Sequence, residues 1–207
     1  MITFPELFRA ILTADKDESR QAARGVRKFL YSSNGKSKDD YKNESRDIKD
    51  IINRAPGEYA KIAENWRQEN FVIAISVIYY LHDEKQNQPD FLFPWLFNLL
   101  QHKNGNVRHA AVRMIDHEMG TLTVHLRFPG ERLRFSELSA GDADRILAGL
   151  FVNLQHLEAS SRKPAYRKYK YISSLLSGTY KSAQILLSHL EDDCGEEYLD
   201  RLANGFM

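Results

Sequence analysis

The sequence contains one cysteine, Cys194, among 207 residues. A single cysteine excludes an internal disulfide and a cysteine-rich zinc site, and it fits a reducing compartment. Long hydrophobic runs are missing as well: the longest, Phe71–Leu81, falls far short of the roughly 20 residues that cross a bilayer. The N-terminal segment lacks the small-residue cleavage site of a secretory signal. We therefore expect a cytoplasmic protein with no membrane segment, in which Phe71–Leu81 is a buried helix.

An excess of charge of one sign is also missing. The 29 Lys and Arg residues are balanced by 28 Asp and Glu residues, which gives a formal net charge of +1. No field of the whole molecule therefore attracts nucleic acid or an anionic membrane, and any such attraction must come from a local patch. Charged residues make up 28% and aromatic residues 11% of the chain, as in folded soluble proteins. We expect one continuous domain over residues 1–207.

Signatures of catalysis and of metal binding are absent from the sequence. It has no HExxH, no paired cysteines, no Asp-rich loop, no GxSxG and no Gly-rich phosphate loop. His109 and His117 are two helical turns apart, roughly 12 Å, which is too far to bind one ion through bonds near 2 Å. Cys194 is surrounded by carboxylates in EDDCGEE, which would raise its pKa and suppress the thiolate. We predict no metal and no cofactor, and the sequence favours a non-catalytic protein over an enzyme.

Helical periodicity dominates what is present. From Val107 onward the apolar residues recur at the spacing of one helix face: Val107, Ala110, Ala111, Met114 and Ile115. Similar stripes occur within 146–157 and 183–190. The turns at Asn104–Asn106 and Ser177–Thr179 are so short that the helices they join must be antiparallel neighbours. The sequence therefore predicts an all-α fold of about nine or ten helices.

An internal repeat lies within this pattern. The segment FPELFRAILTADKDESRQAARGVRKFL (4–30) aligns with FPWLFNLLQHKNGNVRHAAVRMIDH (93–117) with one single-residue gap in the turn. Each copy has a proline in the first turn of a helix, then a turn, an arginine and two alanines. The matched positions are Phe4, Pro5, Leu7, Phe8, Arg20, Ala22 and Ala23 with Phe93, Pro94, Leu96, Phe97, Arg108, Ala110 and Ala111. Ser19 replaces Val107 in the first copy.

The second copy resembles the HEAT repeat and the wider class of armadillo-like helical repeats. The resemblance is carried by Pro94, Leu96, Leu99, Leu100, Asn106, Val107, Arg108, Ala110, Ala111 and Ile115. It implies a right-handed α-solenoid of stacked antiparallel helix pairs, whose second helices line a concave surface that binds a partner. The expected function is a scaffold or adaptor for another protein. The residues expected on its concave face are Arg108, His109, Val112, Arg113 and Asp116.

Two segments interrupt the repeat pattern. The stretch Tyr31–Asp47 is polar and poor in apolar residues, so we expect an exposed loop near 32–47, followed by a short helix at Ile48–Arg54. The stretch Thr121–Leu138 alternates roughly between apolar and charged residues around Pro129, which is typical of a small hairpin or an irregular loop. We favour the loop because isolated hairpins are marginally stable.

The strongest local signal is basic and aromatic. Within Ser160–Leu176, five cationic residues and three tyrosines occur without an acidic residue. Helical spacing would place Tyr166 and Tyr169 in the core and leave the cations on the open side. Such a segment suggests binding to the phosphate backbone of DNA or RNA, as in a HEAT-like DNA repair protein, with arginines of the 121–138 segment reaching the same end of the stack. The alternative is an ordinary basic surface paired with the acidic tail Glu191–Asp200. The residues of the nucleic-acid alternative are Arg127, Arg132, Arg134, Arg162, Lys163, Arg167, Lys168, Lys170 and Tyr171.

Overall fold

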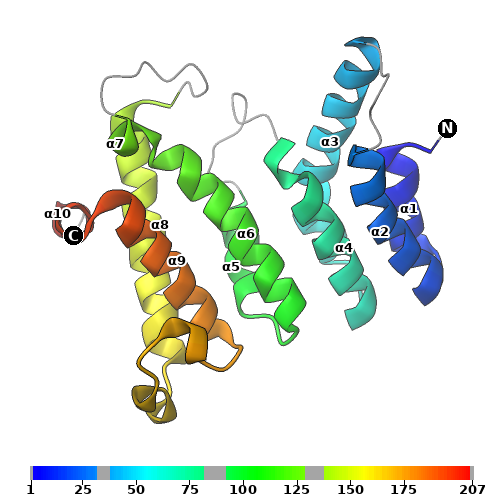
Figure 1. Cartoon of the computed structure of the whole chain (residues 1–207). Helices are drawn as coiled ribbons and strands as arrows, with labels where there is room; N and C mark the ends of the chain where they lie inside the picture. Colours follow the sequence, from blue (N-terminus) through cyan, green and yellow to red (C-terminus); the bar gives the residue numbers. More distant parts are fainter. Residues whose placement is uncertain (1, 32–37, 82–91, 129–137, 206–207) are drawn as a thin grey trace. The chain divides into compact units, whose positions relative to one another are not determined.

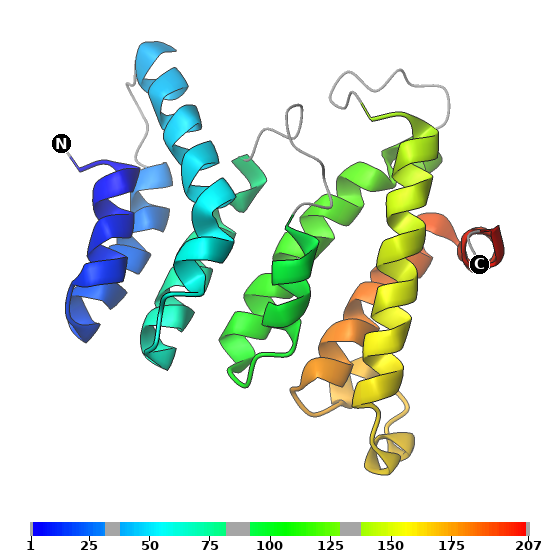
Figure 2. The same ribbon diagram turned by 180° about the vertical axis from the view of Figure 1, so that it is seen from behind.

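The computed structural model describes residues 2–31, 38–81, 92–128 and 138–205 (Figures 1 and 2). Within these ranges every regular element is an α-helix or a 3-10 helix and none is a strand, which confirms the prediction of an all-α protein. The contact pattern divides the chain into two compact units, Met1–Asp83 and Glu84–Met207, where the sequence led us to expect one domain. The two units are described separately below, and they contain one copy of the repeat each.

Residues 2–31 and 38–81 of the first unit form four α-helices and a 3-10 turn: α1 (Phe4–Thr13), α2 (Lys16–Tyr31), α3 (Lys38–Tyr59), α4 (Asn65–Ile78) and η1 (Tyr79–Leu81). A capping box opens α1, because the Thr3 hydroxyl accepts the Glu6 N–H while the Glu6 carboxylate accepts the Thr3 N–H. α2 and α4 both pack on α1 and on each other. The apolar run that begins at Phe71 is buried in α4, as predicted.

α3 differs from the loop expected near 32–47. The helix begins at Lys38 and continues through the predicted short helix to Tyr59, while residues 32–37 lie outside the described ranges. The reason is local: residues 38–47 contain neither glycine nor proline, so nothing in the backbone stops the helix from extending beyond its apolar part.

The described residues of the second unit, 92–128 and 138–205, form six α-helices and two 3-10 turns: α5 (Phe93–Leu100), α6 (Gly105–Leu122), α7 (Val124–Arg127), α8 (Ala140–Ser161), η3 (Pro164–Lys168), η4 (Ile172–Ser174), α9 (Thr179–Cys194) and α10 (Glu196–Gly205). α5 packs on α6, α8 packs on α9, and α6 packs on α9. Both ribbon views place α5 and α8 on one side of this unit and α6 and α9 on the other. The predicted stripe of α6 is buried: Val107, Ala110, Ala111, Met114 and Ile115.

The segment expected as a loop or hairpin near 121–138 is helical at its start. α6 ends at Leu122, and α7 follows after Thr123. Residues 129–137, which include Arg132 and Arg134, lie outside the described ranges.

The basic segment is not the continuous helix that we expected. α8 ends at Ser161, Arg162 and Lys163 are extended, and two short 3-10 turns follow. Pro164 explains the end of the helix, since it lacks an N–H and disfavours helical backbone in the residue before it. The prediction that helical spacing places Tyr166 and Tyr169 in the core is therefore wrong: both side chains are partly exposed, and Leu175 is the buried residue of the segment.

Candidate functional site

In the described part of the second unit, a groove with a volume of about 1160 Å³ lies between α5 and α8. We call it the α5–α8 groove. Its residues from α5 and the turn after it are Phe93, Pro94, Phe97 and Gln101, and those from the α8 side are Leu138, Asp142, Arg145, Ile146, Gly149, Leu150, Asn153, His156, Leu157 and Ser160. The groove exists because α5 packs on α6 while α8 packs on α9, so the two outer helices leave a channel between them.

The floor of the groove is apolar and its rim is polar. Phe93, Leu150 and Leu157 are all buried, and the side chains of Phe97 and Ile146 are partly exposed above them. The rim residues Gln101, Asn153, His156 and Ser160 are exposed and supply hydrogen-bond donors and acceptors. At one end, Arg145 forms an ion pair with Asp142 at 2.6 Å. Protein interfaces also have an apolar centre inside a polar rim.

The groove is long as well as wide. Its residues on α8 extend from Asp142 to Ser160, which at 1.5 Å per residue is roughly 27 Å of helix. Small-molecule sites are compact cavities that enclose most of their ligand. An open channel of this length matches a polypeptide segment better than a metabolite.

Gly149 lies in the middle of the groove. A Cβ atom built at this position meets no atom within 4 Å, so the glycine leaves open space instead of relieving a close contact. Glycine in a helix interior costs about 1 kcal/mol relative to alanine. Gly149 therefore lowers the stability of α8, and no close contact within the unit requires a glycine there. The missing side chain keeps the channel wide.

The residues predicted for a concave face separate into two groups. Arg108 is 7% exposed, and its guanidinium donates to the carbonyls of His102 (2.6 Å) and Lys103 (2.9 Å) and to the Ser177 hydroxyl (2.7 Å). Val112 is also buried. The Arg108 guanidinium is therefore bonded within the protein. Both side chains line, together with His109, a small pocket of about 160 Å³.

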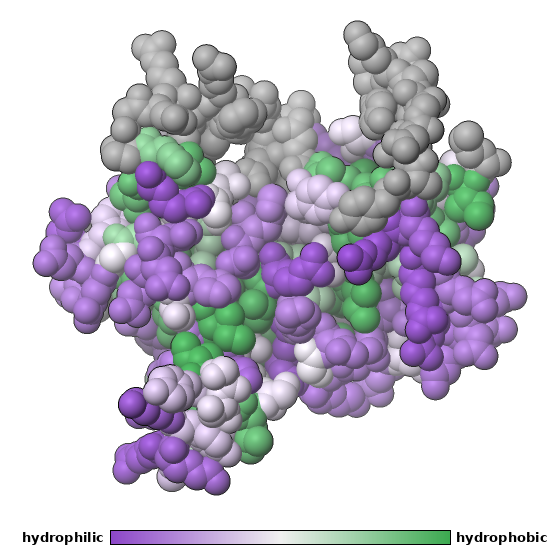
Figure 3. Space-filling model, in the orientation of Figure 1, coloured by the Kyte–Doolittle hydropathy of each residue, from purple (hydrophilic) through white to green (hydrophobic). Residues whose placement is uncertain are grey.

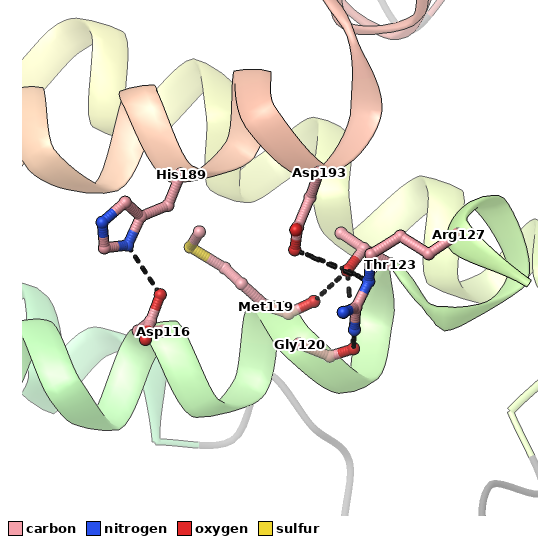
Figure 4. Close-up of polar contacts among 7 residues, drawn as sticks. All are labelled: Asp116, Met119, Gly120, Thr123, Arg127, His189 and Asp193. Carbon is pink, nitrogen blue, oxygen red and sulfur yellow. Dashed lines mark hydrogen bonds and ion pairs between the residues drawn. The ribbon is translucent and has the colours of Figure 1, made fainter.

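The remaining three predicted residues, His109, Arg113 and Asp116, are exposed. Asp116 accepts a hydrogen bond of 2.7 Å from Nδ1 of His189 on α9 (Figure 4). That pair joins α6 to α9 at the surface, so only His109 and Arg113 of the predicted set lack a partner in the described part of the chain.

The residues of the nucleic-acid prediction do not lie together. Arg127 is at the junction of α6, α7 and α9, where it donates to the Gly120 carbonyl (2.5 Å) and the Thr123 hydroxyl (3.1 Å) and lies 3.8 Å from Asp193 (Figure 4). Arg162, Lys163, Arg167, Lys168, Lys170 and Tyr171 lie at the other end of α8 and α9. The expectation that Arg127 reaches the basic segment is wrong, because the whole length of α8 separates them.

A second polar cluster joins α7, α8 and α10. Asp144 accepts hydrogen bonds from His125 Nε2 (2.7 Å) and from the Tyr198 hydroxyl, and burial together with the Asp144 carboxylate raises the pKa of Tyr198. Nearby, burial raises the pKa of Cys194 to about 11, and the Asp193 carboxylate adds to the shift. The upward direction confirms the sequence prediction, but burial is the larger cause. A protonated thiol and a phenol held neutral make this cluster a structural junction, not a nucleophilic site.

We expect Cys194 to react slowly with iodoacetamide. Because only the thiolate reacts, a pKa near 11 should make alkylation at pH 8 at least about tenfold slower in the folded chain than in the urea-unfolded chain. The rate in the folded chain should rise with pH as far as about pH 11. Equal rates in the folded and unfolded chains would show that the thiol is exposed and unperturbed.

The described residues contain no group of three or more His, Cys, Asp or Glu side chains placed to hold a metal ion. Over the same ranges, no helix combines the length and the apolar character needed to cross a membrane. Comparison of the chain with protein-family models, with curated proteins and with solved structures finds no match. The candidate site therefore stands on its geometry alone.

Neither the α5–α8 groove nor its residues were predicted from the sequence. The HEAT resemblance directed attention to the second helix of the repeat, whereas the groove is formed by the first helix, α5, and by α8. One signal was available: Gly149 lies beside the apolar stripe of 146–157, inside a predicted helix, at a position where alanine would favour the helix.

Proposed function

We propose that the chain is a non-catalytic scaffold or adaptor of the HEAT-like helical repeat class, and that its α5–α8 groove binds an amphipathic helix of a partner protein. The observation that carries the proposal is the shape and polarity of the groove, a channel roughly 27 Å long with an apolar floor and a polar rim. The two repeat copies, in α1–α2 and α5–α6, support the repeat assignment.

The spacing of the floor residues specifies the partner. Ile146, Leu150 and Leu157 project from one face of α8, and Phe93 and Phe97 face them from α5. A partner helix with apolar residues at i, i+3 or i+4, and i+7 would place them along this floor, as in other helix-in-groove complexes. Its polar flanks would meet Gln101, Asn153 and His156. Because α5 and α8 are already held in place by α6 and α9, binding would not require ordering of the groove.

The test fills the groove without disturbing the core. Helical peptides of about 18 residues are selected by display on the immobilised chain, and their affinities are compared between the wild type and Gly149→Leu. We expect at least a hundredfold weaker binding by Gly149→Leu, because the leucine occupies the open space above the floor. Its folding should not suffer, since leucine gains about 1 kcal/mol of helix propensity over glycine.

Gly57→Leu is the matched control. Gly57 lies inside α3 of the first unit, and a Cβ atom there also meets nothing within 4 Å. The control should bind the selected peptides like the wild type, and peptide-induced NMR shifts should be confined to amides of α5 and α8. Selected peptides that bind Gly149→Leu as tightly as the wild type would refute the proposal.

A further inference from the structure

Two stretches of the sequence are basic and free of acidic residues, 19–38 and 159–190, and each contains six Lys and Arg residues. The second stretch contains the basic segment 162–170. Outside residues 159–190, the chain carries 23 Lys and Arg against 28 Asp and Glu. A chain with a net charge of +1 therefore holds a region of about six positive charges beside a remainder that is net negative. Such a distribution creates a local positive potential that the net charge conceals.

The five cations between Arg162 and Lys170 are available to a ligand. All five side chains are exposed, and none forms an ion pair or hydrogen bond with the described part of the chain. The contrast with other arginines is clear: Arg108 and Arg127 both donate to backbone carbonyls. The segment Arg162–Tyr171, which we call the basic turn, has no corresponding structural role for its charges.

The basic turn is held in a defined conformation. Its 3-10 turns project from the end of α8 as a separate lobe below the helices (Figures 1 and 3). The ring of Tyr166 stacks on Tyr180 of α9 at 4.7 Å between centroids, with 24° between the ring planes. Lys181 donates to the carbonyls of Ser173 and Leu175, both at 3.0 Å, and Leu175 is buried. These contacts fix the backbone and leave the cations outside.

Tyr171 is the exposed aromatic of this lobe. Its side chain is 62% exposed, whereas the ring of Tyr166 is stacked on that of Tyr180. The Lys170 ammonium lies 5.3 Å from the centre of the Tyr171 ring. An exposed ring beside a cation offers a stacking surface to an unpaired base whose phosphate the cation neutralises. A base inside a duplex has no free face for such a ring.

We propose that the basic turn binds single-stranded nucleic acid, with Arg162, Lys163, Arg167, Lys168 and Lys170 on the phosphates and Tyr171 stacked on a base. The basic turn begins just after Ser160, the last groove residue of α8, and shares no residue with the α5–α8 groove. The proposal does not depend on peptide binding in the groove. The neighbouring Leu176 is 64% exposed. An exposed leucine beside cations would favour an anionic membrane over an oligonucleotide, because its side chain could insert among the lipids.

The test is fluorescence anisotropy with labelled oligouridine and oligothymidine of about 12 nucleotides. If five cations neutralise phosphates, the affinity should fall about a hundredfold between 50 and 200 mM salt, because the slope for single strands is about −0.7 per phosphate contact. Arg167→Glu combined with Lys170→Glu should weaken binding at 50 mM salt at least about a hundredfold and reduce the slope. Tyr171→Ala should cost about tenfold with the slope unchanged, and Tyr171→Phe should retain the affinity.

Arg113→Glu combined with Arg201→Glu is the control for net charge, since both side chains are exposed on the same unit and outside the basic turn. The proposal predicts that this variant binds like the wild type. It is overturned if neither oligonucleotide binds at 50 mM salt, if the control loses as much affinity as the basic-turn variant, or if duplex DNA binds as tightly as the single strand. It is also overturned if binding is seen only with phosphatidylserine-containing vesicles and is lost in Leu176→Ala.

Discussion

Arg108→Ala is expected to lower the free energy of unfolding of the second unit by about 3 kcal/mol. The buried guanidinium donates to two carbonyls in the turn between α5 and α6 and to the hydroxyl of Ser177 in the turn before α9. Hydrogen bonds from a charged donor are worth about 1.5–3 kcal/mol each, and they are not additive. Removing the side chain deprives the carbonyls of His102 and Lys103 of this donor and disconnects the two turns.

The internal repeat supplies the control for this prediction. Arg20 occupies the same repeat position in α2, but its side chain is exposed, so Arg20→Ala should change stability by less than about 0.5 kcal/mol. Urea unfolding of Arg108→Ala is followed in a Trp66→Phe background, where Trp95 of α5 reports the second unit, and that of Arg20→Ala in a Trp95→Phe background, where Trp66 of α4 reports the first unit. Equal effects of the two substitutions would show that the buried contacts of Arg108 do not stabilise the unit.

Arg108 also shows where sequence reasoning reached its limit. The apolar periodicity correctly predicted the helix and its buried stripe. The HEAT resemblance placed Arg108 on a ligand-binding surface, because a repeat pattern identifies a residue type and a helix but not the direction of one long side chain. Only the position of Ser177, far along the chain, determines that the guanidinium points into the protein.

The candidate groove was harder to predict for a similar reason. Apolar stripes indicate which face of a helix is buried, and they predicted the buried leucines of α8. A groove depends on which helices do not pack together, and α5 and α8 are separated by about 40 residues of sequence that carry two other helices. The end of α8 before the basic turn could have been predicted from the sequence, because Pro164 is a clear signal for the end of a helix.

The two repeat copies use arginine in the same way but from different helices. In the second copy, Arg108 of α6 donates to two carbonyls of the turn that follows α5. In the first copy, the corresponding Arg20 is exposed, and the carbonyls of Ile11 and Ala14 at the end of α1 are capped by Arg67 of α4, at 3.1 and 3.0 Å. Ser19, which replaces the valine of the second copy, also donates to the Ile11 carbonyl at 2.9 Å and accepts from Asn70 of α4. Position 19 is therefore occupied by a serine because its hydroxyl links Asn70 of α4 to the Ile11 carbonyl at the end of α1.

Arg67→Ala should accordingly destabilise the first unit by about 2 kcal/mol. The Arg67 side chain is 12% exposed, contacts Glu64 at 3.3 Å, and lies 4.4 Å over the ring of Trp66, so the substitution removes both the cap and its packing. Arg24→Ala, at an exposed position of α2, is the control and should be nearly neutral.

The Arg67→Ala measurement is native-state amide hydrogen exchange, because Trp66 itself changes its surroundings in this variant. Protection should fall about thirtyfold for the amides of α1, α2 and α4, which is the factor that corresponds to 2 kcal/mol. A loss confined to the first turn of α4 would mean that Arg67 only stabilises its own helix. A loss shared by α1 and α2 would mean that the cap joins α4 to the repeat, the role that Arg108 has within the second copy.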